Sequence, residues 1–134
     1  MVLTLYKRVF FCYNRKDEIA GDETMETKNG VMTVDTRDCR NMNAVGRAVL
    51  YAFASAKAQG VRIVRILHTE QRINQLRPFL RKLQRIGGIT FSIEAKNLGQ
   101  ENDPGSLFLR ENFEKETADP SFWERDPGVT VVCV

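Results

Sequence analysis

Residues 41–97 read NMNAVGRAVLYAFASAKAQGVRIVRILHTEQRINQLRPFLRKLQRIGGITFSIEAKN, and this stretch decides the expected fold. Apolar residues recur at helical spacing over residues 41–59, between an asparagine cap and a glycine stop. The run VRIVRIL at 61–67 is short and strongly apolar, as in a strand inside a partly parallel sheet. A helix over residues 70–86 and a strand over 89–94 follow, so the stretch predicts an α/β unit.

Strands are expected on both sides of this unit. Residues 2–13 are rich in β-branched and aromatic side chains and are predicted to form a long strand. Residues 23–28 and 31–36 flank Asn29-Gly30, a dipeptide that favours a two-residue hairpin because both residues tolerate positive φ. The C-terminal part is expected to hold a loop, a short helix over 107–117 and a final strand.

The predicted order is three strands followed by alternating helices and strands. Short connections and right-handed crossovers leave few arrangements for such an order. The simplest is a mixed five-stranded sheet flanked by helices. Its first three strands are antiparallel, and its later strands run parallel to the first. With 134 residues, 43% of them apolar, we expect residues 1–134 to form a single α/β domain.

The second predicted helix contains a proline. Thr69 is expected to cap this helix, which would then run from Glu70 to Ile86. Pro78 lies inside it and lacks a backbone donor, so we expect a kink, or a break near Gln75.

The cysteines and the hydropathy indicate a reducing compartment. Cys12, Cys39 and Cys133 are far apart in sequence and form no CxxC motif, which argues for reduced thiols and against a zinc site. No run approaches 18 apolar residues, the length of a membrane span. We therefore expect a cytoplasmic protein that does not associate with membranes, and no cofactor is indicated.

Positive charge is concentrated in the middle of the chain. Between Lys57 and Arg85 there are eight basic residues and one acid, Glu70. Arg77, Arg81 and Arg85 follow one another at intervals of four, so they share a helix face that can follow a phosphate backbone. The predicted nucleic-acid-binding residues are Arg77, Arg81, Arg85, Lys82 and Arg72. The alternative is a solvated helix face that pairs with the acidic C-terminal segment.

The segment AVLYAFASAKAQGVRIVRILHTEQRINQL, residues 48–76, carries a family resemblance. It resembles the first helix, the glycine-valine turn, the fourth strand and the entry to the next helix of the ribonuclease H-like fold. A small-subunit ribosomal protein family has a similar order of elements. The resemblance therefore implies a topology rather than an activity.

Active ribonuclease H-like proteins hold two metal ions with four carboxylates. The positions of this sequence that match those carboxylates are occupied by Cys12 or Asn14, Asn43, Thr69 and Asp103. Glu70 is one residue away from the third position. The resemblance thus implies that nuclease activity is absent and that there is no metal site.

Two further patterns suggest weak catalytic candidates. His68 follows the strand at 61–67, at the sheet edge that ligands favour, and could act as a general base oriented by Glu70. An ordinary loop histidine is the alternative. Glu94-Ala95-Lys96 together with Asp35 is similar to the PD-(D/E)XK nucleases, so a divergent metal-dependent nuclease remains a third hypothesis. Asp103 is the remaining candidate.

Acidic segments flank the basic centre, at residues 17–26 and 111–126. They suggest a second kind of function, a small viral or mobile-element accessory or inhibitor protein that binds a nucleic-acid-binding protein. The alternating aromatics Tyr6, Phe10, Phe11 and Tyr13 could stack bases or pack in a core.

The chain ends on the apolar run Val129 to Val134, which would be a poor free edge. We predict a homodimer or partner contact there, with burial in its own sheet as the alternative. The function that the sequence favours is non-catalytic binding of an RNA or DNA backbone by the basic helix face.

Overall fold

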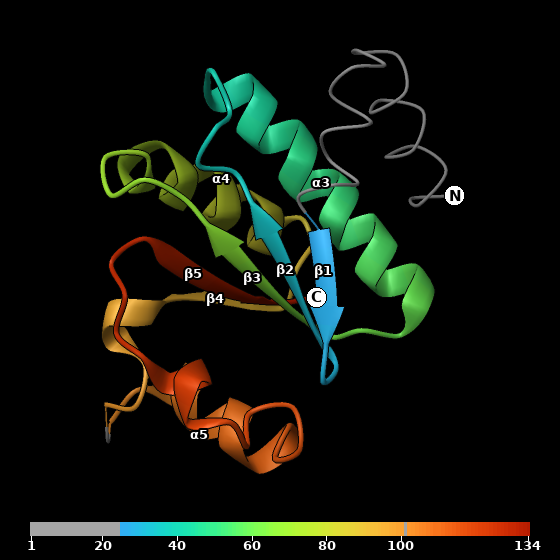
Figure 1. Cartoon of the computed structure of the whole chain (residues 1–134), viewed down its shortest axis with the longest axis vertical. Coiled ribbons are helices and arrows are strands. Elements are labelled where there is room, and N and C mark those ends of the chain that lie inside the picture. Colours follow the sequence, from blue (N-terminus) through green and yellow to red (C-terminus); the bar gives the residue numbers. More distant parts are fainter. Residues whose placement is uncertain (1–24, 101) are drawn as a thin grey trace.

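The computed structural model describes residues 25–100 and 102–134, which form a single α/β domain (Figure 1). The strands are β1 (Met25–Lys28), β2 (Val31–Asp35), β3 (Ile63–Leu67), β4 (Phe91–Glu94) and β5 (Val129–Cys133). The helices are α3 (Met42–Gln59), α4 (Ile73–Arg85) and α5 (Pro104–Asn112), with short 3-10 turns η1 (Ala95–Asn97) and η2 (Pro120–Trp123). The strand predicted over residues 2–13, with its aromatics and Cys12, lies outside the described residues, as do residues 17–24 of the acidic flank.

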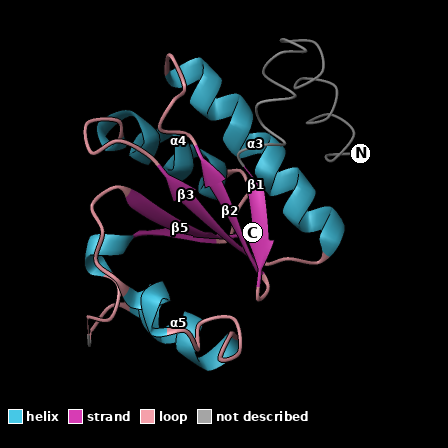
Figure 2. Ribbon diagram, in the orientation of Figure 1, coloured by secondary structure: helices cyan, strands magenta, loops and turns pink. Residues whose placement is uncertain are grey.

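The five described strands form one mixed sheet in the order β1-β2-β3-β5-β4 (Figure 2). β1 and β2 pair antiparallel across Asn29 and Gly30, whose φ values of 56° and 78° are those of a tight hairpin turn. β2 and β3 pair in parallel, with Val31 opposite Ile63. The predicted hairpin and the parallel placement of the VRIVRIL strand are therefore confirmed.

The position of β5 corrects two expectations. β5 lies between β3 and β4 and pairs antiparallel with both, so the last strand is not parallel to the others. All five of its residues are buried. Both of its edges are hydrogen-bonded within the same chain, so the run Val129 to Val134 offers no free edge to a second subunit. Burial in its own sheet, the alternative, is what the structure shows.

The two faces of the sheet are covered unequally. Helices α3 and α4 pack on one face, where Val49, Phe53 and Leu80 meet Val64 and Ile66 of β3. Helix α5 and η2 cover part of the other face, around β5 and β4 (Figure 1). Strand alternation places Arg65 on that second face, between the buried Val64 and Ile66. The core therefore consists of two clusters separated by the sheet.

Helix boundaries follow the sequence signals for α3 but not for α4. Asn41 caps α3, since its side-chain oxygen accepts the Ala44 N–H at 2.9 Å, and Gly60 ends the helix with φ 73°. Helix α4 begins at Ile73 instead of Glu70, because Thr69 to Arg72 form a turn. Pro78 lies inside α4 without ending it, so the predicted break near Gln75 is wrong.

Helix α5 spans residues 104–112 instead of 107–117, because Asp103 caps it and Pro104 occupies its first turn. Cys133 is a buried free thiol, and burial raises its pKa. Within residues 25–100 and 102–134, no helix has the length and apolar character needed to cross a membrane.

Candidate functional site

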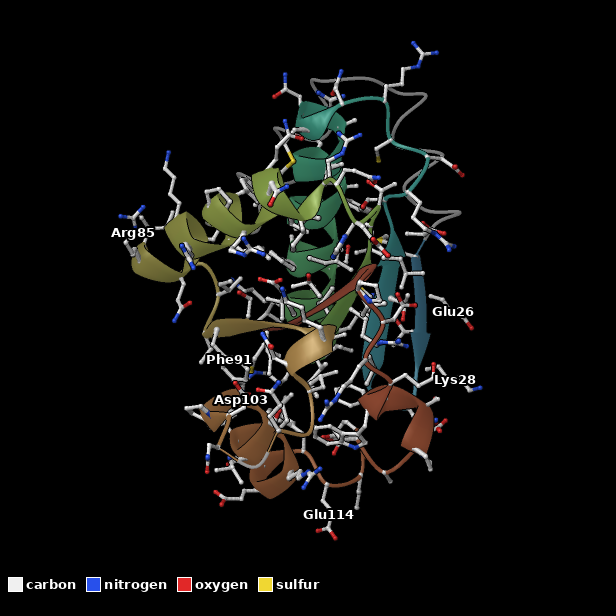
Figure 3. All side chains as sticks on the ribbon, turned by 90° about the vertical axis from the view of Figure 1, so that its left-hand side faces the viewer. Glu26, Lys28, Arg85, Phe91, Asp103 and Glu114 are labelled. Atoms are coloured by element: carbon white, nitrogen blue, oxygen red, sulfur yellow. The ribbon has the colours of Figure 1, made fainter. Side chains whose placement is uncertain are left out.

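A groove of about 500 Å³ follows β4, the last strand of the sheet order, between α4 and α5. α4 contributes Arg77, Arg81 and Gln84, and α5 and its cap contribute Asp103, Pro104, Gly105 and Phe108. Residues 90–94 and Asn97 lie between them. A second hollow, lined by Pro78, Arg81, Gln84 and Arg85, continues around α4. Figure 3 shows Arg85, Phe91 and Asp103 along this side of the molecule.

The α4 wall is basic because of how the helix packs. Leu76, Leu80 and Leu83 are buried and fix one face of α4 against the core. The arginines at 81 and 85 are one and two turns beyond Arg77, so they follow one another along the groove side of the helix. The row predicted from the sequence is therefore present on one side of α4.

Arg77 is held inside the groove by Glu94 of β4. Its Nε and Nη2 atoms donate to the two carboxylate oxygens of Glu94 at 2.6 and 2.9 Å. Lys96 Nζ lies 3.6 Å from the same carboxylate. The hydrogen bond from Arg77 holds the pKa of Glu94 below its ordinary value. The planar two-point contact fixes the arginine in place, so Arg77 has less freedom to contact a ligand than the sequence implied.

The other predicted cations are differently placed. Arg81, Lys82 and Arg85 are exposed and make no hydrogen bond or ion pair with any other residue that the structure describes. Lys82 lies about 100° around the helix from Arg81 and so points away from the groove row. Arg72 is the partly buried residue before the first turn of α4, and it does not continue the row.

The α5 wall is aromatic at its centre. The rings of Phe91 and Phe108 meet edge to face, with centroids 5.4 Å apart, and Phe108 remains 37% exposed. Asp103, a weak catalytic candidate, lies at the start of α5, where its carboxylate accepts the Ser106 N–H at 2.7 Å. The Asp-Pro pair at 103–104 is a helix-start signal, and the sequence analysis missed it by placing the helix three residues later. The predicted helix boundaries therefore did not indicate that Phe108 lines the groove.

His68 is a structural residue in the described fold. It is 2% exposed, with Nδ1 2.8 Å from the Thr69 carbonyl and Nε2 2.9 Å from the Thr130 hydroxyl. Because a carbonyl oxygen only accepts, Nδ1 donates to Thr69, and Nε2 pairs with the Thr130 hydroxyl. Glu70 is exposed in the following turn and does not contact the imidazole. The pair therefore lacks the geometry of an oriented general base.

The acidic candidates lie on separate elements. Asp35 ends β2 and binds Arg37, whose Nε and Nη2 donate to it at 2.9 and 2.6 Å, which lowers the pKa of Asp35. Glu94 ends β4, with β3 and β5 between the two strands, a separation of about 14 Å at the usual strand spacing. The Asp35 and Glu94 pair of the PD-(D/E)XK interpretation is therefore not brought together. Asn43, in the first turn of α3, is exposed.

Comparisons of this chain with protein-family models, curated proteins and solved structures found no significant match.

The ion pair in the groove predicts a pH-dependent stability. Because Arg77 lowers the pKa of Glu94 from 4.5, the contact stabilises the fold above that pH and is lost as the pH falls through the lowered pKa. Replacing Glu94 with glutamine should lower the melting temperature by a few degrees at neutral pH. The difference from wild type should vanish in acid. Glu111→Gln, on the exposed surface of α5, is the matched control. It should leave the melting temperature unchanged both at neutral pH and in acid. If Glu94→Gln and wild type differed in melting temperature by the same amount in acid as at neutral pH, the stabilising role of the Arg77–Glu94 ion pair would be contradicted.

Proposed function

We propose that this protein binds the sugar-phosphate backbone of RNA or DNA through Arg81 and Arg85 of α4, without catalysing a reaction on it. Lys82 adds positive charge to the same helix. Exposed arginines attract phosphates and match their oxygens with two parallel donors. The groove beside them gives the strand a path along β4.

The observation that carries this proposal is the unpaired charge on α4. No acidic residue occurs between Glu70 and Glu94. Glu94 pairs with Arg77 of α4 and with Lys96 of its own segment, and not with Arg81 or Arg85. The alternative interpretation, a solvated helix face, required the α4 arginines to pair with the acidic segment 111–126. In the described structure Arg81 and Arg85 make no such pair. Two unpaired arginines beside a groove favour a ligand that supplies negative charge.

Charge reversal at two positions tests the proposal. The double variant Arg81→Glu/Arg85→Glu should lose binding to labelled single- and double-stranded oligonucleotides at low salt, as measured by fluorescence anisotropy. Its melting temperature should stay close to that of wild type, because exposed charges contribute little to stability. Neutral replacement of both arginines by glutamine should reduce the slope of log Kd against log salt by about 2.

The matched control makes the same change of charge away from α4. Arg40 and Lys115 are exposed and have no ionic partner among the described residues, so Arg40→Glu/Lys115→Glu should bind nearly as wild type does. Equal losses in both double variants would point to net charge alone, and absence of wild-type binding at low salt would refute the proposal. Cleavage of the oligonucleotide with Mg²⁺ or Mn²⁺ would favour the nuclease hypothesis instead.

A second candidate function is supported by the opposite charge near α5. Glu111, Glu114 and Glu124 are exposed and make no ion pair with other described residues. Figure 3 shows Glu114 at the end of the molecule below the groove, away from Arg85. Such a surface suits a basic protein partner, as expected of a viral or mobile-element accessory or inhibitor protein. A packed protein interface would depend less on salt than nucleic-acid binding does.

The ribonuclease H-like relationship is also a proposal. It is supported by the succession β2-α3-β3-α4-β4 and by the parallel pairing of β2 and β3. The antiparallel β5 between β3 and β4 departs from the arrangement that the resemblance implied.

A further inference from the structure

We propose that the groove between α4 and α5 selects a single strand of nucleic acid over a duplex, with a base stacked against Phe108. This inference rests on the proposed function and specifies its ligand.

The aromatic wall presents a ring to the ligand. Phe108 contacts Phe91 edge to face at 5.4 Å and Phe113 at 6.1 Å between centroids, so neighbouring rings support it. It nevertheless remains 37% exposed and lines the groove. Stacking on an aromatic side chain requires an unstacked base, which a single strand offers and an intact duplex does not.

The charged wall lies opposite the rings. Arg81 and Gln84 line both the groove and the hollow that continues to Arg85, so the two spaces form one path around α4. A strand whose base contacts Phe108 can therefore place its following phosphates on Arg81 and Arg85. The two acids in the groove are already engaged, Glu94 by Arg77 and Asp103 by the α5 N-terminus. They repel a phosphate less than free carboxylates would.

Unused hydrogen-bonding groups surround the same space. Gln84, Ser92 and Asn97 line the groove, and their side chains make no hydrogen bond with the described residues. Amide and hydroxyl groups can donate to and accept from the edge of an exposed base. The groove thus combines phosphate contacts, a stacking ring and polar groups, at a volume of about 500 Å³ that is typical of ligand sites.

The test compares one strand with its duplex. Fluorescence anisotropy would measure binding of the full chain to single-stranded DNA and RNA of about 12 nucleotides and to the duplex of the same sequence. Wild type should bind the single strands more tightly. Phe108→Leu keeps apolar volume against Phe91 but removes the ring, and it should weaken single-strand binding by about 5- to 150-fold while leaving duplex binding unchanged.

Two further variants complete the design. Phe108→Trp keeps an aromatic ring and should retain single-strand binding. Leu107→Ala, which removes an exposed apolar side chain of α5 outside the groove, should have no effect. Circular dichroism and melting temperature would establish that each variant is folded.

The outcomes separate this inference from the proposed function. If Phe108→Leu binds both ligands as wild type does while Arg81→Glu/Arg85→Glu binds neither, the stacking role is wrong and backbone binding stands. Tighter wild-type binding to the duplex would also overturn the single-strand inference. If wild type binds no oligonucleotide but an acidic peptide instead, both proposals are wrong.

Discussion

Replacing Ile66 with aspartate is expected to abolish cooperative folding of this protein. Ile66 is fully buried in β3, within the cluster that joins α3 and α4 to the sheet. β3 is the third of five strands and pairs on both sides, with β2 and with β5. An unpaired charge there costs several kcal/mol, against a total stability of about 5–15 kcal/mol for a typical domain. Thermal and urea unfolding followed by circular dichroism would measure the effect.

The control introduces the same charge into a neighbouring strand. Thr33 of β2 lies opposite Arg65 on the less covered face and is only partly buried. Thr33→Asp should therefore keep a cooperative transition close to that of wild type. A soluble, cooperatively folded Ile66→Asp would show that β3 is not the centre of the core.

Deletion of residues 129–134 is expected to prevent folding of the remaining chain. The deletion removes β5, whose loss leaves β3 and β4 without their shared partner. It also removes Thr130, which contacts His68, and the carbonyl of Val134, to which Arg62 Nε donates at 2.7 Å. No remaining described strand lies beside β4, so the helices would cover a divided sheet. Circular dichroism and size-exclusion chromatography of the truncated chain would show the loss.

A milder variant tests the polar contact between β5 and His68 without removing the strand. Thr130→Val keeps β5 but removes the hydroxyl that lies 2.9 Å from His68 Nε2. A buried polar group left without a partner costs about 1–3 kcal/mol, so this variant should fold with reduced stability. A truncated chain that remained folded would mean that the strand is dispensable and would reopen the question of a contact between subunits.

Local sequence signals determined most of the elements. Asn29-Gly30 specified the hairpin because its positive φ angles are costly for other residues. Asn41 and Gly60 specified the ends of α3 through a side-chain acceptor and a left-handed cap. The apolar run at Ile63–Leu67 specified a buried strand, since burial on both faces requires no polar alternation. The spacing of Arg77, Arg81 and Arg85 likewise specified one helix face.

Only the tertiary structure decided the position of β5 and the composition of the groove. The sequence of an apolar strand does not distinguish a position at the edge of a sheet from one at its centre. The position depends on which strands the rest of the chain leaves available for pairing. The pairing of Arg77 with Glu94, 17 residues away, and the approach of Phe108 to Phe91 join separate elements. Such contacts leave no periodic signal in the sequence. The chain by itself therefore determined the hairpin, α3, β3 and the basic row. Packing across the sheet determined which arginines stay unpaired and which side chains face them.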